Sequence, residues 1–389
     1  MIVIVAPYSP PNRNCFAHLG ASRKLETIIS ILSRFDTQIV LVNSAHNECI
    51  CSPLVIIQSQ ICSINLMEIK LPTYSSRMIG KLINIFLAKQ VLDVLQKMGS
   101  PQLFWFYNGY GFEMRMASLA WRAFRAPMIL EFEDWIFARS RGFNPKPYID
   151  YYLWRQAAHL MSGTFAVNSL LAKKIHSVVS SVDLLPGVVP EILANIGKHF
   201  PPFSNASSSI SIGFFGGLSI EKGADIVLKL ATTLPEGYVL HVTGSGPLMA
   251  DFEVFSREYP ARLCYYGQVN DTVLYGLIAQ CDVMLNPHSS IEKMDNGVFP
   301  FKVIEAVASG RLLISTALPT QDLEEVLLGV QFVDHSTHAF IDAIVKARER
   351  YCQHSTLISQ CSKLANQRFG EDALLKKVKD FVSCNRYTK

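Results

Sequence analysis

The strongest constraint on this chain is the alternation of short apolar runs with longer amphipathic stretches, in two successive series. Such alternation is typical of parallel-sheet α/β units, in which a helix follows each buried strand. The apolar runs lie at 2–6, 38–42, 103–107, 127–132 and 163–167, and then at 211–215, 238–242, 262–266, 282–286 and 311–315. The sequence therefore predicts two Rossmann-like doubly wound domains that face each other across a cleft. We expect the ligand site there, at the carboxyl ends of the strands.

One linker separates the two series. The pair Pro201-Pro202 precedes a small polar segment at 204–209, and 389 residues suffice for two domains with full cores. We therefore predict an N-terminal domain over residues 1–203 and a C-terminal domain over 204–370. The remaining residues, 371–389, contain one further predicted helix.

Composition excludes a disordered chain and favours an intracellular protein. Hydrophobic residues make up 49% of the chain and charged residues 17%, a balance that predicts some surface in contact with lipid or a partner. The first apolar run is too short for a signal peptide or a membrane span. Nine scattered cysteines, with Cys49 and Cys51 the only close pair, indicate reduced thiols in the cytoplasm and no zinc site.

Charge is distributed unevenly along the chain. Residues 1–203 hold 19 Lys and Arg against 12 Asp and Glu, whereas the remainder holds 17 against 20. The basic half could meet anionic lipid or a phosphorylated substrate, although uneven surface charge alone would also explain the difference. Within it, residues 75–99 have helical apolar spacing and carry Arg77, Lys81, Lys89 and Lys97. Core packing explains the apolar face, and the basic face is a candidate contact with the membrane.

Two glycine-rich turns in the second half are candidate phosphate sites. The segment 214–228, FFGGLSIEKGADIVL, runs from a strand through Gly216, Gly217 and Lys222 into a helix. Glycines allow close backbone approach, and a lysine adds charge for a diphosphate, but such turns also occur for packing alone. A second turn, TGSGPL at 243–248, places Gly244 and Gly246 at the end of the next strand.

A third element combines a lysine and an acid on one helix. In DNGVFPFKVIEAVASG (295–310), Lys302 and Glu305 are three residues apart and therefore share a helix face. The acid could accept hydrogen bonds from a ribose while the lysine and the helix N-terminus hold phosphate. A surface ion pair would give the same spacing.

Taken in order, the three elements resemble the donor domain of family 4 glycosyltransferases and their GT-B relatives. The likeness is carried by EKG at 221–223, TGSGP at 243–247, and FPFKVIEAVASG at 299–310, and it extends over residues 210–316. It implies that Lys222 binds phosphate and that Glu305 binds ribose. It also implies that the backbone over Val298, Phe299, Pro300 and Phe301 faces the diphosphate, with N–H groups from the residues other than proline. It further implies that the helix over 371–383 crosses back to the first domain.

Two departures from the family pattern concern the donor site. Gly217 stands where the family usually has an arginine, and Gly297 stands where the commonest signature has its first glutamate. We predict that Lys302 takes over the phosphate role of the missing arginine. The chain resembles a subgroup with a Phe-Pro-x-Lys-x-x-Glu variant of the signature.

The first domain offers candidates for the acceptor side. Arg13, His18 and Arg23 lie in or after the loop that follows the first strand, where a histidine is more often structural than catalytic. Glu133 and Asp134, with Glu131, end a strand where the family often has a histidine or an acid near the reacting sugar. These carboxylates are candidate catalytic groups, and structural pairing with Arg139 or Arg141 is an equal alternative.

These residues and the resemblance together predict a glycosyltransferase, and the resemblance implies a retaining mechanism. The catalytic candidates are Lys222, Lys302, Glu133 and Asp134. Its substrates would be a nucleotide-diphosphate sugar and a saccharide or lipid-linked acceptor, with no metal, cofactor or nucleic acid. It would act in the cytoplasm or on the inner membrane face. Two alternatives stay open: a nucleotide-sugar epimerase on the same scaffold, and a degenerate subunit that binds without turnover.

Overall fold

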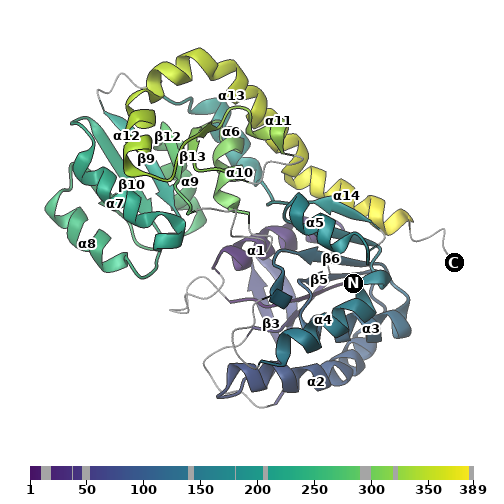
Figure 1. Ribbon diagram of the computed structural model, residues 1–389. Coiled ribbons are helices and arrows are strands. Elements are labelled where there is room, and N and C mark those ends of the chain that lie inside the picture. The colour runs from purple at the N-terminus through teal and green to yellow at the C-terminus, as the bar shows by residue number, and fades with distance from the viewer. Residues whose placement is uncertain are drawn as a thin grey trace. The chain divides into compact units, whose positions relative to one another are not determined.

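The computed structural model describes residues 1–9, 19–36, 38–45, 53–138, 144–179, 181–204, 209–289, 299–318 and 323–384. Their contacts divide them into two compact units, shown together in Figure 1. Unit 1 holds the described residues within 1–188 and 372–389, and unit 2 those within 189–294 and 299–371. The sequence places the boundary at residue 203, whereas the contacts assign the segment from Val189 onward to unit 2. The reason is local packing: a Cβ on Gly197 would lie 3.1 Å from the Ser309 carbonyl oxygen of unit 2.

Unit 1 is built on a sheet of eight strands in the order β3-β4-β2-β1-β5-β6-β7-β8. All neighbours are parallel except the β3-β4 hairpin, which is antiparallel at one edge. Strands β1, β2, β5, β6 and β7 are buried along their whole length, as their continuous apolar sequences predict. The strands are β1 (Ile2–Ala6), β2 (Ile39–Asn43), β3 (Val55–Ile61), β4 (Ile64–Lys70), β5 (Leu103–Tyr107), β6 (Met128–Phe132), β7 (Gly163–Ala166) and β8 (Val182–Leu184).

Helices cover this sheet, and the last of them comes from the end of the chain. Leu374, Leu375, Val378 and Val382 of α14 belong to the same buried cluster as β1 and β5, so α14 is part of unit 1 (Figure 1). The helices are α1 (Leu19–Ser33), α2 (Arg77–Met98), α3 (Gly111–Phe124), α4 (Lys146–Ala157), α5 (Ser169–Ile175) and α14 (Glu371–Cys384), with short 3-10 turns η1 (Ile136–Ala138) and η2 (Ala158–Leu160).

Unit 2 has a six-stranded parallel sheet in the order β11-β10-β9-β12-β13-β14. The chain runs outward from β9 to β11 and then outward the other way from β12 to β14, so the strand order reverses between β9 and β12. Ligands of open α/β sheets bind at the carboxyl ends of the strands at such a reversal. The strands are β9 (Ile210–Phe215), β10 (Tyr238–Thr243), β11 (Leu263–Tyr265), β12 (Val283–Asn286), β13 (Leu312–Ser315) and β14 (Gln331–Phe332).

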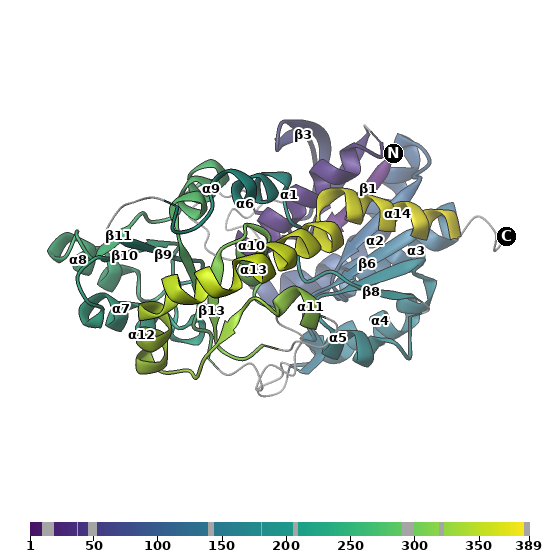
Figure 2. The ribbon, with the colours of Figure 1, turned by 90° about the horizontal axis from the view of Figure 1, so that it is seen from above.

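Helices lie on both faces of the second sheet. Figure 2 shows α6 and α9 on one side of it and α7 and α12 on the other. The helices are α6 (Glu191–His199), α7 (Ala224–Thr233), α8 (Met249–Glu258), α9 (Asp271–Gln280), α10 (Phe301–Ala308), α11 (Glu324–Leu327), α12 (Thr337–Val345) and α13 (Ala347–Phe369), with the 3-10 turn η3 (Ile220–Lys222). The two predicted doubly wound sheets are thus confirmed. Within the described part of the chain, no helix has the length and apolar character that a membrane span requires.

Candidate active site

Two glycine-rich turns of unit 2 pack directly on each other. Gly216 follows β9, Gly244 follows β10, and the Gly216 N–H donates to the Thr243 carbonyl at 3.1 Å. Gly244 has φ +131°, and a Cβ there would lie 1.8 Å from the Gly216 carbonyl oxygen. A Cβ on Gly246 would lie 2.5 Å from the Leu218 carbonyl oxygen. Close backbone packing therefore requires glycine at positions 244 and 246, which is the packing role that the sequence analysis left open. The same packing fixes the loop that leads to Lys222.

Lys222 is held beside a histidine from the loop after β12. Its Nζ lies 3.0 Å from His288 Nε2 and 3.7 Å from Glu221 Oε1, and its side chain is 33% exposed. The two loops are joined further by Ser289, whose N–H and Oγ both donate to the Glu221 carbonyl. The lysine is thereby placed at the point where the strand order reverses, with its ammonium group partly open to solvent.

Lys302 lies on the first turn of α10 and points toward β9. Its Nζ is 4.3 Å from the centre of the Phe214 ring. Burial, with a smaller contribution from the nearby charge of Lys222, lowers the pKa of Lys302 to about 7. Burial also lowers the pKa of His288 to about 4, with Lys222 and Lys302 both contributing. Three basic side chains thus gather at one place, where an anion would stabilise their charged forms.

The amino end of α10 lies at the same site as these basic side chains. Pro300 is the N-cap residue, and none of the described side chains caps the helix. The Val303 N–H donates to the Pro300 carbonyl, whereas the N–H groups of Phe301 and Lys302 lie in the first turn, which has no partner within the helix to offer them. Phe299 is buried and Phe301 is half-buried. Glu305 lies one turn further along and is 6% exposed. The structure thus brings Gly216, Lys222, Lys302 and Glu305 together in unit 2, while Val298 and Gly297 lie outside the described residues.

Gly217 has room for a side chain. Among the described residues, a Cβ there would meet only Lys222 Cγ, at 3.6 Å, which is ordinary van der Waals contact. The residue is exposed. A longer side chain at this position would therefore extend beside Lys222 without displacing backbone.

The carboxylates at the end of β6 belong to a buried network in unit 1. Lys24 Nζ lies 2.7 Å from Glu131 Oε1 and also pairs with Glu133. Trp105 Nε1 donates to Glu131 at 3.0 Å, and the Tyr107 hydroxyl donates to Glu133 at 2.6 Å. The partner of these acids is therefore Lys24, which the sequence analysis did not identify; Arg139 and Arg141 lie outside the described residues.

Electrostatics within this network follow from burial and from the single lysine. Burial raises the pKa of Glu131, with Lys24 acting in the opposite direction. Burial also works against the charge of Glu133, yet Lys24 and the Tyr107 hydroxyl hold its pKa below the usual value. Burial opposes the charge of Lys24 as well, but Glu131 and Glu133 together raise its pKa. Glu133 is accordingly an anion with both oxygens engaged.

The remaining acceptor-side candidates are only partly placed. Asp134 is half-buried, and its N–H donates to Asn108 Oδ1 at 3.1 Å. Arg23 is half-buried on α1, next to Lys24. Arg13 and His18 lie outside the described residues. Among the side chains that the structure describes, His, Cys, Asp and Glu form no group of three that could hold a metal.

Sequence and structure comparisons identify the C-terminal unit and the fold. Residues 209–349 match the family model for group 1 glycosyl transferases. No curated protein matches the chain by sequence.

Solved structures align with the whole chain at low identity. Sucrose-phosphate synthase from Thermosynechococcus elongatus has a TM-score of 0.68 at 12% identity, covering 100% of this chain and 99% of its own. Anabaena HepE in complex with UDP-glucose has a TM-score of 0.64 at 13% identity, with coverages of 99% and 100%. Trehalose-phosphate synthase from Burkholderia xenovorans, in complex with glucose-6-phosphate, has a TM-score of 0.65 at 12% identity, with coverages of 98% and 99%.

These comparisons agree with the architecture of the two sheets. The chain has the GT-B fold, and its residues 209–349 match the group 1 glycosyl transferase model. The protein is a transferase enzyme.

Proposed function

We propose that this chain is a retaining glycosyltransferase of the family 4 type that uses a nucleotide-diphosphate sugar as donor and a saccharide or lipid-linked acceptor. The observation that carries the proposal is the cluster of Lys222 and Lys302 at the strand reversal of unit 2, next to the N-terminus of α10, which no described side chain caps. Two ammonium groups and the N–H groups at the start of a helix form a site for a diphosphate. Glu305, buried on the same helix, is the proposed partner of the ribose hydroxyls.

The proposed reaction places negative charge where these groups lie. The bond between the sugar C1 and the diphosphate oxygen breaks, and a bond from C1 to the acceptor oxygen forms on the same face. The acceptor proton passes to the leaving phosphate, so the step needs no metal. Lys222 and Lys302 stabilise the charge that grows on the diphosphate, an effect of about 10²-fold to 10³-fold for a well-placed donor.

The acceptor side is proposed to lie in unit 1. Glu133 and Asp134 follow β6 at the carboxyl edge of its sheet, where parallel α/β sheets bind ligands. The Lys24 network holds Glu133 in one position, so this carboxylate would orient an acceptor hydroxyl or stabilise positive charge on the sugar. Arg13, His18 and Arg23 remain candidates for acceptor contacts.

Bound ligands in two similar structures support this choice of substrates. The HepE structure contains UDP-glucose, and the trehalose-phosphate synthase structure contains glucose-6-phosphate. We propose by analogy that the present chain binds a nucleotide sugar and a saccharide-containing acceptor. A cytoplasmic location on the inner membrane face, in polysaccharide biosynthesis, would suit a lipid-linked acceptor.

A panel of donors tests the proposal. UDP-, GDP-, ADP- and dTDP-sugars are examined by thermal shift and by release of nucleoside diphosphate, with and without lipid-linked saccharides. We expect one nucleotide to raise the melting temperature, and turnover to depend on the acceptor. Conversion of the donor without any acceptor would indicate an epimerase, and binding without turnover would indicate a degenerate subunit. Binding of none of the four donors would contradict the proposal.

A further inference from the structure

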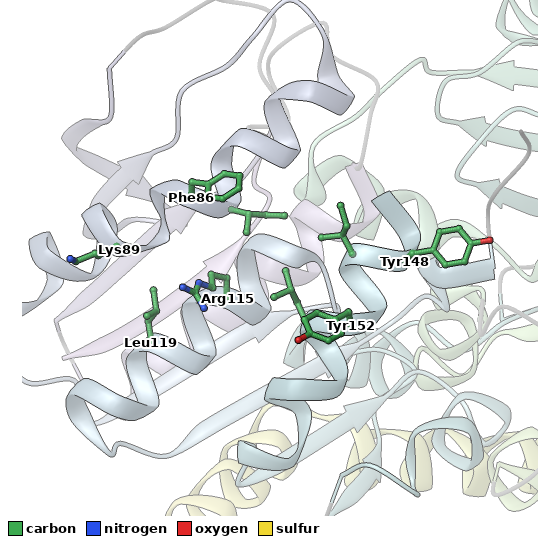
Figure 3. A pocket seen from close by; sticks show the side chains of 9 residues that line it. Phe86, Lys89, Arg115, Leu119, Tyr148 and Tyr152 are labelled. Atoms are coloured by element: carbon green, nitrogen blue, oxygen red, sulfur yellow. The ribbon is translucent and has the colours of Figure 1, made fainter. Parts of the chain in front are cut away.

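The outer surface of α2, α3 and α4 contains an apolar groove. Its cavity volume is about 640 Å³, and Figure 3 shows Phe86 of α2, Arg115 of α3 and Tyr152 of α4 around it. Phe86 is 83% exposed. The full lining is Ile85, Phe86, Lys89, Arg115, Leu119, Tyr148, Ile149, Tyr152 and Leu153. Large apolar side chains gathered in one exposed place cost free energy in water and mark a surface that a partner covers.

The exposed apolar surface continues beyond the groove along α2. Met78, Ile79 and Ile83 are all more than a third exposed on the same helix. The prediction that core packing explains the apolar residues of 75–99 therefore needs correction. Val91 and Leu95 do face the core, but the first half of the helix presents apolar side chains to solvent.

Charge on these three helices has one predominant sign. Their exposed charged residues are Lys89, Asp93, Lys97, Arg115, Arg122 and Arg155, five basic and one acidic among the described side chains. Lys89 and Arg115 line the groove itself. A partner must therefore combine apolar groups with negative charge, which is the chemistry of an anionic lipid surface.

We propose that the groove and the adjoining face of α2 form a docking surface, which we call the α2–α4 surface, for anionic membranes. Phe86 and the neighbouring aliphatic side chains enter the boundary between headgroups and acyl chains. Tyr148 and Tyr152 suit the same depth, because their rings are apolar and their hydroxyls polar. Lys89 and Arg115 contact lipid phosphates. The proposal rests on the proposed function only for its purpose, which is to bring the enzyme to a lipid-linked acceptor.

Sedimentation with vesicles tests this surface. The full-length protein is mixed with one of two kinds of vesicle. One is pure phosphatidylcholine, and in the other roughly one lipid in three is the anionic phosphatidylglycerol. We expect binding to the anionic vesicles at low salt, and weakening of that binding as salt is added. Phe86→Ser combined with Tyr152→Ser should lower the partition coefficient about tenfold or more. Val254→Ser with Tyr259→Ser is the matched control and should bind as the wild type does, because these exposed residues lie on α8 and directly after it, in unit 2.

A second pair of variants separates charge from apolar contact. Lys89→Gln with Arg115→Gln should lower binding to anionic vesicles about tenfold and reduce its salt dependence. Lys229→Gln with Arg257→Gln removes the same charge from unit 2 and should have a much smaller effect. The proposal would be overturned if the wild-type protein stayed in the supernatant with anionic vesicles. It would also be overturned if the groove variants bound these vesicles as strongly as the wild type does. A lipid-free dimer that Phe86→Ser dissociates would assign the surface to a second copy instead. Donor-induced thermal shift in the same variants reports the donor site separately.

A second inference concerns the histidine beside Lys222, and it rests on the proposed role of that lysine. His288 is fully buried, and its Nδ1 lies 2.9 Å from the Ser289 carbonyl oxygen, which can only accept. The hydrogen of the neutral ring therefore sits on Nδ1. Nε2 then presents its lone pair to the Lys222 ammonium group at 3.0 Å.

We infer that His288 is a positioning residue that holds Lys222 in the orientation needed by the leaving diphosphate. The Thr316 hydroxyl donates to the His288 carbonyl at 2.7 Å, so the backbone of the loop is fixed as well. Because the imidazole is neutral, it orients the ammonium group without reducing its net charge. A carboxylate in the same place would neutralise the lysine that the diphosphate requires.

Two polar substitutions test this inference. Asn can replace the Nδ1 donor but has no acceptor at the place of Nε2, whereas the Gln carbonyl oxygen can occupy that place. We expect His288→Asn to lower kcat about tenfold or more with a smaller change in KM, and His288→Gln to recover most of that loss. In a Lys222→Ala background, His288→Asn should cause little further loss.

Three results would overturn the inference. One is equal impairment of the Asn and Gln variants. Another is a loss from His288→Asn that multiplies fully with that of Lys222→Ala. The third is normal kcat in a folded His288→Asn enzyme. Failure of the wild-type protein to bind any donor would instead contradict the proposed function itself.

Discussion

Replacing Lys302 by Met should remove a charge whose presence depends on pH near neutrality. Met keeps the aliphatic stem over Phe214 but has no ammonium group. We expect kcat/KM to fall about 10²-fold below pH 7, because the lost cation stabilises charge that grows on the diphosphate. Lys222→Ala should cause a loss of similar size, since both lysines act on the same group.

The structure also predicts how this loss changes with pH. The pKa of Lys302 is lowered to about 7 by burial, so the useful charge is present below pH 7 and is lost above it. In the free enzyme, roughly one molecule in ten keeps that charge at pH 8 and roughly one in a hundred at pH 9. Because kcat/KM reports ionisations of the free enzyme, its wild-type value should fall with rising pH, whereas Lys302→Met should lack this descent. The difference between the two enzymes should almost disappear near pH 9.

Replacing Gly217 by arginine should restore activity to the Lys302→Met enzyme. Gly217 has room for a side chain beside Lys222, and a guanidinium group keeps its charge across this pH range. Gly217→Arg combined with Lys302→Met should therefore recover about tenfold or more of the lost activity and show no descent between pH 7 and 9. The assay is steady-state release of nucleoside diphosphate with the donor identified by the panel. Near-normal turnover of folded Lys302→Met at pH 6, or a parallel descent in both enzymes, would refute the reasoning.

Three further predictions concern binding and stability. Glu305→Ala should weaken nucleotide binding by about 1.5 to 3 kcal/mol in calorimetric titration, and unchanged affinity in a folded variant would exclude the ribose role. Lys24→Met should lower the free energy of unfolding by about 3 to 5 kcal/mol, because it leaves Glu131 and Glu133 buried without their cation; urea unfolding that matches the wild type would contradict this. Gly244→Ala should cost at least about 2 kcal/mol in the same measurement, since its Cβ would overlap the Gly216 carbonyl, and a smaller loss would mean that the two turns separate easily.

Periodicity was sufficient to predict the buried parallel strands and α10. Strands such as β5 and β9 are continuous apolar runs bounded by turns, and Lys302 and Glu305 share a helix face whenever that segment is helical. The β3-β4 hairpin escaped prediction because β3, at the edge of the sheet, alternates half-buried with exposed residues and has a mixed sequence. The unit boundary also differed. Composition marks a linker at 204–209, whereas the packing of α6 assigns the segment before that linker to unit 2.

Pairings between distant residues were decided only by the tertiary structure. Lys24 meets Glu133 across 109 positions of sequence, and Lys222 meets His288 across 66. No local pattern encodes these contacts, because they arise where the ends of parallel strands converge in one edge of a sheet. The same holds for the pKa of Lys302, which depends on how deeply the fold buries the ammonium group and on the cation that it places nearby. The sequence alone determined the kinds of side chain available to the donor site, and folding determined which of them carry charge there.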